Sequence, residues 1–200
     1  MKAQTLSLLV GLFSLKTIAN AQEKRLEYTI KRNGDVVGNI HFAHGIAGSR
    51  TVLTLESEVN TRFIFNFNFK VKTKEETIYD KGIMTWSSIF RNLNGNVKVD
   101  KKIKANGNTY TVYKGNKTET LNNYPIHYNM LSVYISEPIN ITKVYSDNFQ
   151  LQIDIQKIAD HHYKIKFPDG NYNEYFYTDG ICSKIEIHHR LYSASIELTS

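Results

Sequence analysis

Apolar and polar residues alternate along most of the chain, and this pattern predicts β-strands. It is clearest at 62–72 (RFIFNFNFKVK), where every second residue is apolar: Phe63, Phe65, Phe67, Phe69 and Val71. Successive side chains of a strand point to opposite faces of the sheet, so this run predicts a strand with one aromatic face. We expect it to belong to one long strand from Thr61 to Tyr79, which bends or bulges partway because few strands are so long.

Shorter alternating runs separated by turn residues fill the rest of the chain. Asn33-Gly34 between two such runs is a strong hairpin signal, because both turn residues must accept a positive φ. Similar turns recur at intervals of about 8–12 residues, which predicts an all-β, up-and-down antiparallel fold of about ten strands. So many strands favour a strongly curled or closed barrel, which protects the sheet edges. A two-layer sandwich is the alternative, and the short hairpin connections favour the barrel.

One short helix is predicted near 127–136. Apolar residues there fit helical spacing, and Pro138 ends the run. A strand is the alternative, because Val133, Tyr134 and Ile135 suit a sheet equally well.

The N-terminus has the pattern of a secretory signal peptide. A positive start at Met1-Lys2 precedes an apolar run of about ten residues, and Ala19-Asn20-Ala21 forms a cleavage site. We therefore expect residues 1–21 to be a signal peptide cleaved after Ala21. Residues 22–200 would then form a single β-barrel-like domain that is periplasmic or secreted. No later run approaches the roughly 20 apolar residues of a membrane helix, so no transmembrane segment is expected after cleavage.

The predicted mature chain is mildly basic. Without Lys2 and Lys16 it keeps 23 of the 25 basic residues against 19 acidic ones, a net charge of +4. The densest basic strips lie on predicted strands: Lys70, Lys72 and Lys74, then Lys98, Lys101, Lys102 and Lys104. We expect these strips to form solvated strand faces and predict no nucleic-acid partner. Contact with an anionic lipid, glycan or nucleic acid is the weaker alternative for these strips.

The sequence carries no catalytic or cofactor signature. Cys182 is the only cysteine, so no internal disulfide forms. It lies in a strand-like run, where a buried inert thiol is expected rather than a nucleophile. No serine lies in a nucleophile-elbow context. We expect a protein that is not an enzyme, has no catalytic residues and uses no cofactor.

The paired histidines do not predict a metal site. His188 and His189 would point to opposite faces of a strand, and His161-His162 lies at a predicted hairpin. A zinc site needs three or four convergent ligands. The run from Asp169 lacks the glycine and glutamate positions of a calcium loop, and a hairpin explains it. We therefore predict no metal ligands.

Several segments in this order resemble a known family: KRNGDVVGNIHF, RFIFNFNFKVK, SVYISEPINITKVYSDNF and HHYKIKFPDGNYNEYFYTDGICSKIEI. They resemble an uncharacterised family of exported β-rich proteins from Bacteroidota, catalogued as a domain of unknown function. The resemblance covers nearly the whole mature chain and rests on turns and aromatic strands. It implies an envelope location and a single β domain, and it brings no assigned activity.

Aromatic residues provide the remaining functional hint. The chain has 13 Tyr, 10 Phe and 1 Trp, and the alternation turns many of them inward. They either fill the core of the barrel or line a cavity for an apolar ligand. The candidate ligand-binding residues are Tyr28, Phe63, Phe65, Phe67, Phe69 and Trp86.

Two functional hypotheses follow. The leading one is a non-enzymatic exported β-barrel that binds an apolar or lipid-like ligand in the cell envelope. The alternative is a structural or assembly protein that binds another envelope protein through its sheet surface or edge.

Overall fold

The computed structural model describes residues 22–62, 68–122 and 124–200. In these parts of the chain, 14 strands form one antiparallel sheet. The first eight strands are β1 (Gln22–Arg32), β2 (Asp35–Ala47), β3 (Arg50–Arg62), β4 (Asn68–Asp80), β5 (Ile83–Leu93), β6 (Asn96–Asn106), β7 (Thr109–Lys114) and β8 (Lys117–Leu121). The remaining six are β9 (Lys143–Ser146), β10 (Leu151–Ala159), β11 (His162–Lys166), β12 (Tyr172–Thr178), β13 (Ile181–His189) and β14 (Tyr192–Leu198).

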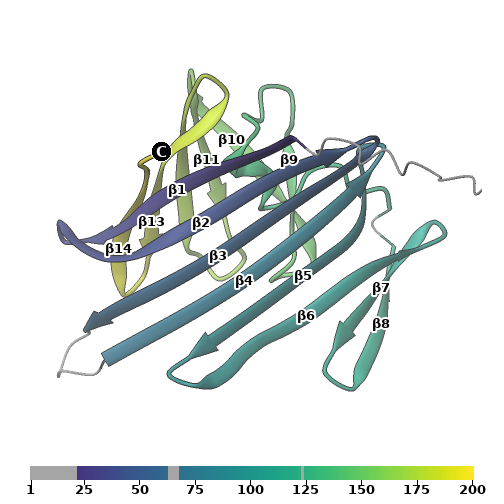
Figure 1. Ribbon diagram of the computed structural model, residues 1–200, viewed down its shortest axis with the longest axis horizontal. Helices are drawn as coiled ribbons and strands as arrows, with labels where there is room; N and C mark the ends of the chain where they lie inside the picture. The colour runs from purple at the N-terminus through teal and green to yellow at the C-terminus, as the bar shows by residue number, and fades with distance from the viewer. Residues whose placement is uncertain (1–21, 63–67, 123) are drawn as a thin grey trace, which may run out of the picture.

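The sheet consists of two meanders that join at the chain ends. Strands β1 to β8 are paired in sequence order, as are β9 to β14, and β14 pairs with β1 in a register that places Tyr28 opposite Leu198. The sheet curls, so that β1 to β6 lie in front of β9 to β13 (Figure 1). Its two edge strands, β8 and β9, do not pair with each other. The sheet is therefore strongly curled but not closed.

The connection from β8 to β9 lies inside the curl. Ile126, Leu131 and Val133 of this inner segment, residues 124–142, are almost completely buried. Its extended part runs along the edge of β9, where the backbone N–H of Met130 donates to the carbonyl oxygen of Tyr145 at 3.1 Å. The inner segment therefore fills part of the core and covers one sheet edge.

The core takes one face from almost every strand. Members of the inward rows include Leu26 and Tyr28 of β1, Ile40 and Phe42 of β2, Leu53 and Leu55 of β3, Tyr163 and Ile165 of β11, and Tyr175 and Tyr177 of β12. Their intervening neighbours are exposed or half-buried. This confirms the predicted alternation and the antiparallel, hairpin-connected all-β fold. Asn33 and Gly34 have φ values of 51° and 89° at the predicted first hairpin.

The predicted strand from Thr61 to Tyr79 is wrong. Strands β3 and β4 are antiparallel, with Thr61 opposite Phe69 and Arg62 opposite Asn68, so the chain reverses within this run. Every paired position joins two odd or two even residue numbers. The odd-numbered residues therefore face inward on both β3 and β4, on either side of residues 63–67.

The helix predicted near 127–136 is reduced to one 3-10 turn, η2 (Ser132–Tyr134). The preceding residues are held extended, because the N–H of Tyr145 donates to the carbonyl oxygen of Tyr128 at 2.9 Å. The inner segment is surrounded by sheet, so its apolar residues need no single helical face. The strand count of 14 also exceeds the predicted ten or so, because short strands such as β8 and β9 form outside the predicted runs. Among the described residues, no helix is long and apolar enough to cross a membrane.

Candidate ligand cavity

The interior of the curled sheet contains an apolar chamber of about 420 Å³. Its walls include Ile30, Val37, Val59, Phe69, Leu93 and Ala194. They come from β1 to β5 on one side and from β13 and β14 on the other. Arg32 and Thr61 add polar groups, and the Arg32 guanidinium donates to the carbonyl oxygen of Arg62 at 3.1 Å. The size lies within the range of small-molecule sites, about 300–1,000 Å³.

A second, polar chamber of about 480 Å³ adjoins the first. Four residues line both chambers: Val71, Ile187, Tyr192 and Ile196. The polar chamber also has charged and amide side chains in its walls, among them Glu75, Arg91, Asp147 and Asn173. One end of the combined cavity is therefore apolar and the other end is polar.

Glu75 and Arg91 form the charged pair of the polar chamber. Oε1 of Glu75 lies 3.9 Å from the Arg91 guanidinium, and only 17% of the Glu75 side chain is exposed. Burial raises the pKa of Glu75 to about 7; the Arg91 charge opposes this rise and the Asp147 charge adds to it. Glu75 therefore exchanges its proton near neutral pH.

Asp147 is the more deeply buried carboxyl group, with 5% of the residue exposed. Its Oδ2 accepts a hydrogen bond from Nδ2 of Asn129 at 3.1 Å. Its Oδ1 is buried and has no hydrogen-bond partner in the part of the chain that the structure describes. Burial raises the pKa of Asp147 to about 6, while nearby polar groups, including Ser87 and Asn129, act in the opposite direction. This oxygen is enclosed by the surrounding protein and is not open to the chamber; an unsatisfied acceptor is unusual for a buried polar atom.

A buried polar network positions Asp147 through Asn129. Nδ2 of Asn129 also donates to Oγ1 of Thr77 at 2.7 Å, and the Tyr79 hydroxyl donates to Oδ1 of Asn129 at 3.0 Å. Tyr79 lies 2.9 Å from Oγ of Ser132 as well. The network joins β4, the inner segment and the start of the turn after β9. It therefore fixes the floor of the polar chamber to the sheet.

The structure separates the residues predicted to bind a ligand. Phe69 lines the apolar chamber. Tyr28 lies in the solid core, where its hydroxyl donates to the carbonyl oxygen of Cys182 at 3.0 Å. Trp86 lines neither chamber; it lies on the outer face opposite Lys104, next to the inward-facing Ser87. Phe63, Phe65 and Phe67 lie outside the described residues.

Sequence reasoning missed Glu75, Arg91 and Asp147. Glu75 lies on the same face of β4 as Phe69 and Val71. Its odd residue number could therefore have predicted that it points inward. Asp147 follows β9 in a turn, and no local pattern shows that this turn faces the cavity. Its position depends on the contact with Asn129, 18 residues earlier in the chain.

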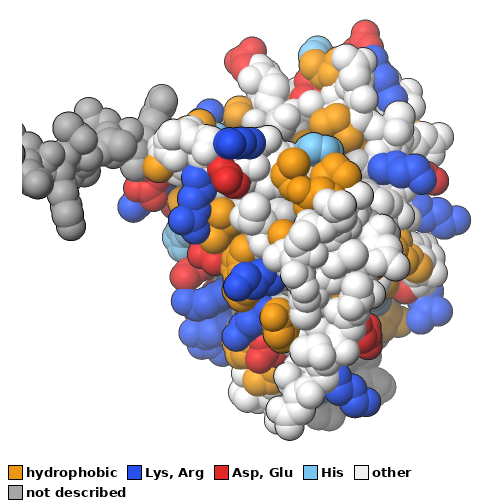
Figure 2. Space-filling model, turned by 90° about the vertical axis from the view of Figure 1, so that its right-hand side faces the viewer, with side chains coloured by type: hydrophobic (Ala, Val, Ile, Leu, Met, Phe, Trp, Pro, Cys, Tyr) orange, Lys and Arg blue, Asp and Glu red, His pale blue; other side chains and the backbone are white. Residues whose placement is uncertain are grey.

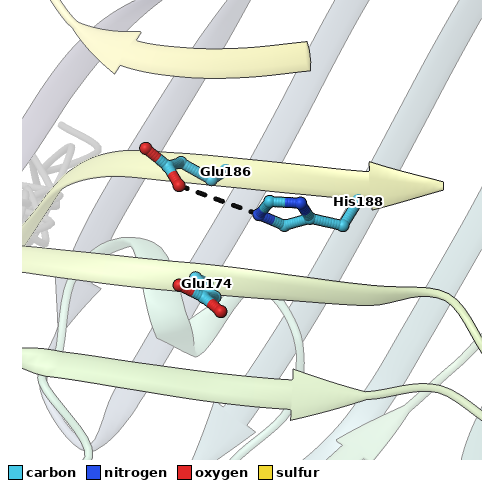
Figure 3. Close-up of side chains that lie close together, drawn as sticks. All are labelled: Glu174, Glu186 and His188. Atoms are coloured by element: carbon cyan, nitrogen blue, oxygen red, sulfur yellow. Dashed lines mark ion pairs between the residues drawn. The ribbon is translucent and has the colours of Figure 1, made fainter. Parts of the chain in front are cut away.

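Possible metal ligands do converge on the outer face of the sheet. Glu174 projects from β12 beside Glu186 and His188 of β13 (Figure 3), and their ligand atoms all lie within 4.8 Å of one another. Each carboxylate is already paired with an ammonium group: Glu174 with Lys164 at 3.3 Å and Glu186 with Lys184 at 2.6 Å. These ion pairs favour a charge network over a cation site. His189 lines the polar chamber on the opposite face, as predicted from its adjacency to His188.

The basic strips are balanced by neighbouring acids. Lys70 and Lys72 both pair with Glu58, at 2.8 and 3.0 Å, and Lys74 pairs with Glu56 at 2.7 Å. On the side of the molecule in Figure 2, Lys and Arg side chains lie among acidic and uncharged ones. The predicted solvated face is confirmed for this strip, whose three lysines are exposed. In the second strip Lys101 is half-buried and donates to the carbonyl oxygen of Asn148 at 2.5 Å.

The predicted state of Cys182 is confirmed. The residue is fully buried, and burial raises the pKa of its thiol to about 12. A thiol with so high a pKa is not a nucleophile near neutral pH.

The model of a family described as a domain of unknown function, DUF6134, matches residues 28–199. The chain belongs to this family. Its fold is similar to the crystal structure of a beta-barrel-like protein of domain of unknown function DUF1849 from Brucella abortus. The TM-score is 0.56 and the identity 11%, over 90% of this chain and 96% of the other. No curated protein matches the chain.

For this DUF6134 chain, the comparisons confirm an uncharacterised family and a barrel-like β fold. At 11% identity the likeness to the Brucella protein concerns the fold alone. Export and an origin in Bacteroidota stay predictions.

Proposed function

We propose that this protein binds an apolar or lipid-like ligand in its interior without catalysing a reaction. The observation that carries the proposal is the apolar chamber of about 420 Å³ between β1 to β5 and the β13–β14 hairpin. The chamber opens to solvent near Leu191, and leaving apolar walls of this extent in contact with water costs free energy. An apolar ligand would cover these walls and bury its own surface.

The walls of the chamber suit a flexible hydrocarbon. They are formed by aliphatic side chains and one phenylalanine ring, and Leu191 lies at the rim with 76% of its surface exposed. An exposed leucine next to an apolar cavity provides a contact for a ligand that enters from water. Among the described residues that line the chamber there is no cysteine and no hydroxyl group paired with a base, so the proposal includes no chemical step.

The proposed location is the cell envelope, as a periplasmic or secreted protein. This part of the proposal rests on the signal-peptide pattern of residues 1–21 and predicts cleavage after Ala21. A molecule that crosses an aqueous compartment needs its apolar part shielded from water, which the apolar chamber would provide.

Native mass spectrometry of the protein, purified without detergent, tests the proposal. We expect an added mass that is lost in organic solvent and corresponds to a molecule with an alkyl part. Ala194→Phe, which fills the apolar chamber, should reduce the occupied fraction at least fivefold, while circular dichroism reports the fold. Ala43→Phe on the outer face of β2 is the matched control and should leave occupancy unchanged. A protein that carries no such molecule and takes up no added dodecanol would refute the proposal.

A partner protein is the second candidate, favoured by the free edge of β8. Among the described strands β8 pairs only with β7, and its first four residues are exposed. Unpaired backbone groups on such an edge can accept a strand from another chain. Crosslinking through a cysteine placed at Thr118 would capture that partner, and capture of nothing under native conditions would exclude this mode.

A further inference from the structure

One end of the curled sheet carries most of its strongly exposed aliphatic side chains. Among the described residues, four large aliphatic side chains have more than half of their surface exposed: Val36 (67%), Val97 (56%), Ile139 (68%) and Leu191 (76%). Val36 and Val97 are the second residues of β2 and β6, and Leu191 lies in the turn between β13 and β14. We propose that these three hairpin tips, the apolar rim, dock on the surface of a lipid bilayer that contains anionic lipids.

The three hairpins point to the same side of the molecule. Every neighbouring pair in the sheet is antiparallel, so β1, β5 and β13 run in the same direction and the turns that follow them lie at one end. Lys31 lies opposite both Val36 of β2 and Ser195 of β14, which makes the β1–β2 and β13–β14 hairpins neighbours. The tips lie on the left and lower left of Figure 1. A flat surface can therefore contact several of them at once.

The apolar chamber opens at this rim. Its wall residues Val37, Leu93 and Leu191 belong to the same three hairpins as the exposed tips. A bilayer that contacts the rim would therefore lie against the mouth of the chamber, and an apolar molecule could pass between them with little exposure to water. The inference goes beyond the proposed function, because it adds a surface and a partner outside the chamber.

The charge of the rim fits an anionic surface. Within three positions of the turn residues 33–34, 94–95 and 190–191, the chain has five basic residues and one acid, Asp35. Arg62, at the end of β3, lies at the same end of the sheet. Arg62, Lys98 and Arg190 are exposed, and none forms an ion pair with an acid in the described parts of the chain. Basic side chains close to a membrane are attracted by its anionic lipids.

The spacing of the apolar side chains favours a bilayer over a folded protein partner. Each exposed tip is a single aliphatic residue on a separate hairpin, whereas the centre of a protein interface is a continuous, tightly packed apolar patch. Single aliphatic side chains can enter the headgroup region one by one, while neighbouring basic groups stay at its surface.

Cosedimentation of residues 22–200 with lipid vesicles tests the inference. One set of vesicles consists of phosphatidylcholine, and the other contains about 30% phosphatidylglycerol. We expect binding to the anionic vesicles to be at least about tenfold tighter than to the neutral ones at low salt. Most of this difference should disappear in about 0.5 M NaCl, because salt screens the attraction.

Two pairs of variants locate the contact. Val36→Ser combined with Val97→Ser should weaken binding to anionic vesicles about fivefold, because less apolar surface enters the bilayer. Ile46→Ser combined with Ile139→Ser is the matched control and should bind as the native protein does. Ile46 lies near the β2–β3 turn, at the opposite end of the sheet. All four positions are exposed, and circular dichroism checks that the fold is retained.

Charge reversal gives a second test of the same surface. Lys98→Glu at the rim should weaken binding about fivefold. Lys24→Glu makes the same change in net charge near the start of β1, at the opposite end, and should have little effect. Equal losses from the rim and control variants would show that binding depends on net charge or composition, and would overturn the placement at the rim.

The remaining outcomes separate this inference from the proposed function. Ala194→Phe fills the chamber and should leave vesicle binding unchanged. A protein that takes up dodecanol but binds neither kind of vesicle, or binds both equally, overturns the inference and leaves the proposed function intact. A protein that binds anionic vesicles through the rim but takes up no dodecanol supports the inference and refutes the proposed function.

Discussion

Nδ2 of Asn129 lies 3.1 Å from Oδ2 of Asp147 and 2.7 Å from Oγ1 of Thr77, so one buried amide joins the inner segment to both sides of the curled sheet. Its Oδ1 accepts from the Tyr79 hydroxyl at 3.0 Å. Asn129 itself is completely buried. The polar chamber and the packing of the inner segment therefore depend on the same side chain.

Replacing Asn129 should destabilise the protein strongly. Asn129→Ala leaves the buried groups of Thr77, Tyr79 and Asp147 without their partner, so the free energy of unfolding should fall by about 3 kcal/mol. Chemical denaturation measures this change. Asn140→Ala at an exposed position is the control and should change stability by less than about 0.5 kcal/mol. A loss below about 1 kcal/mol for Asn129→Ala would show that the network contributes little.

Stability should fall as the pH rises from about 4 to about 8. The pKa of Glu75 is raised from 4.5 to about 7 and that of Asp147 from 3.8 to about 6. In this window the folded protein binds more protons than the unfolded chain, so deprotonation favours unfolding. Each unit of pKa shift corresponds to about 1.4 kcal/mol, so the shift of Glu75 alone should lower the free energy of unfolding by about 3 kcal/mol across this window.

The variant Glu75→Gln isolates this contribution. Its free energy of unfolding should exceed that of the native sequence at pH 8 and approach it at pH 4.5. Glu76→Gln on the opposite face of the same strand should show the native pH dependence. If the free energy of unfolding had the same pH dependence in the native protein and in Glu75→Gln, the raised pKa of Glu75 would be contradicted.

Tryptophan fluorescence should distinguish the two faces of the sheet. Trp86 is the single tryptophan and lies on the outer face, so binding of an amphiphile inside the sheet should leave its emission unchanged. In a Trp86→Phe background, Phe69→Trp places the indole in the apolar chamber. Its emission should shift to shorter wavelength when dodecanol binds. A larger change in the emission of Trp86 than in that of the introduced indole would show that the ligand binds outside the chamber.

Gly38 should not tolerate a side chain. A Cβ there would lie 2.2 Å from the carbonyl oxygen of Glu58 and 2.9 Å from Cα of Val59, both backbone atoms of β3. Because the strands must separate to admit the methyl group, Gly38→Ala should lower the free energy of unfolding by about 2–3 kcal/mol. A Cβ at Gly45, on the same strand, would have no atom within 4 Å, so Gly45→Ala is the matched control. Equal stability of the two variants would contradict the close approach of β2 and β3.

Trp86 shows why face assignments fail where a bulge occurs. Met84 and Trp86 would share a face in a regular strand, yet Tyr79 pairs with Met84 and Ile78 with Trp86. The register shift inserts one extra residue in β5 and inverts the alternation, so Met84 is buried and Trp86 is turned outward. No feature of the local sequence predicts this register shift.

The sequence by itself determined the local features of the protein: alternating strands, hairpins such as the one at Asn33-Gly34, and the buried state of Cys182. These depend on φ/ψ preferences and on side-chain parity, which act between neighbouring residues. Only the tertiary structure decided that the sheet stays open, that the inner segment fills it, and that Glu75 and Asp147 meet beside an apolar chamber. Those features depend on contacts between residues far apart in the chain, whose free energy no short stretch of sequence contains.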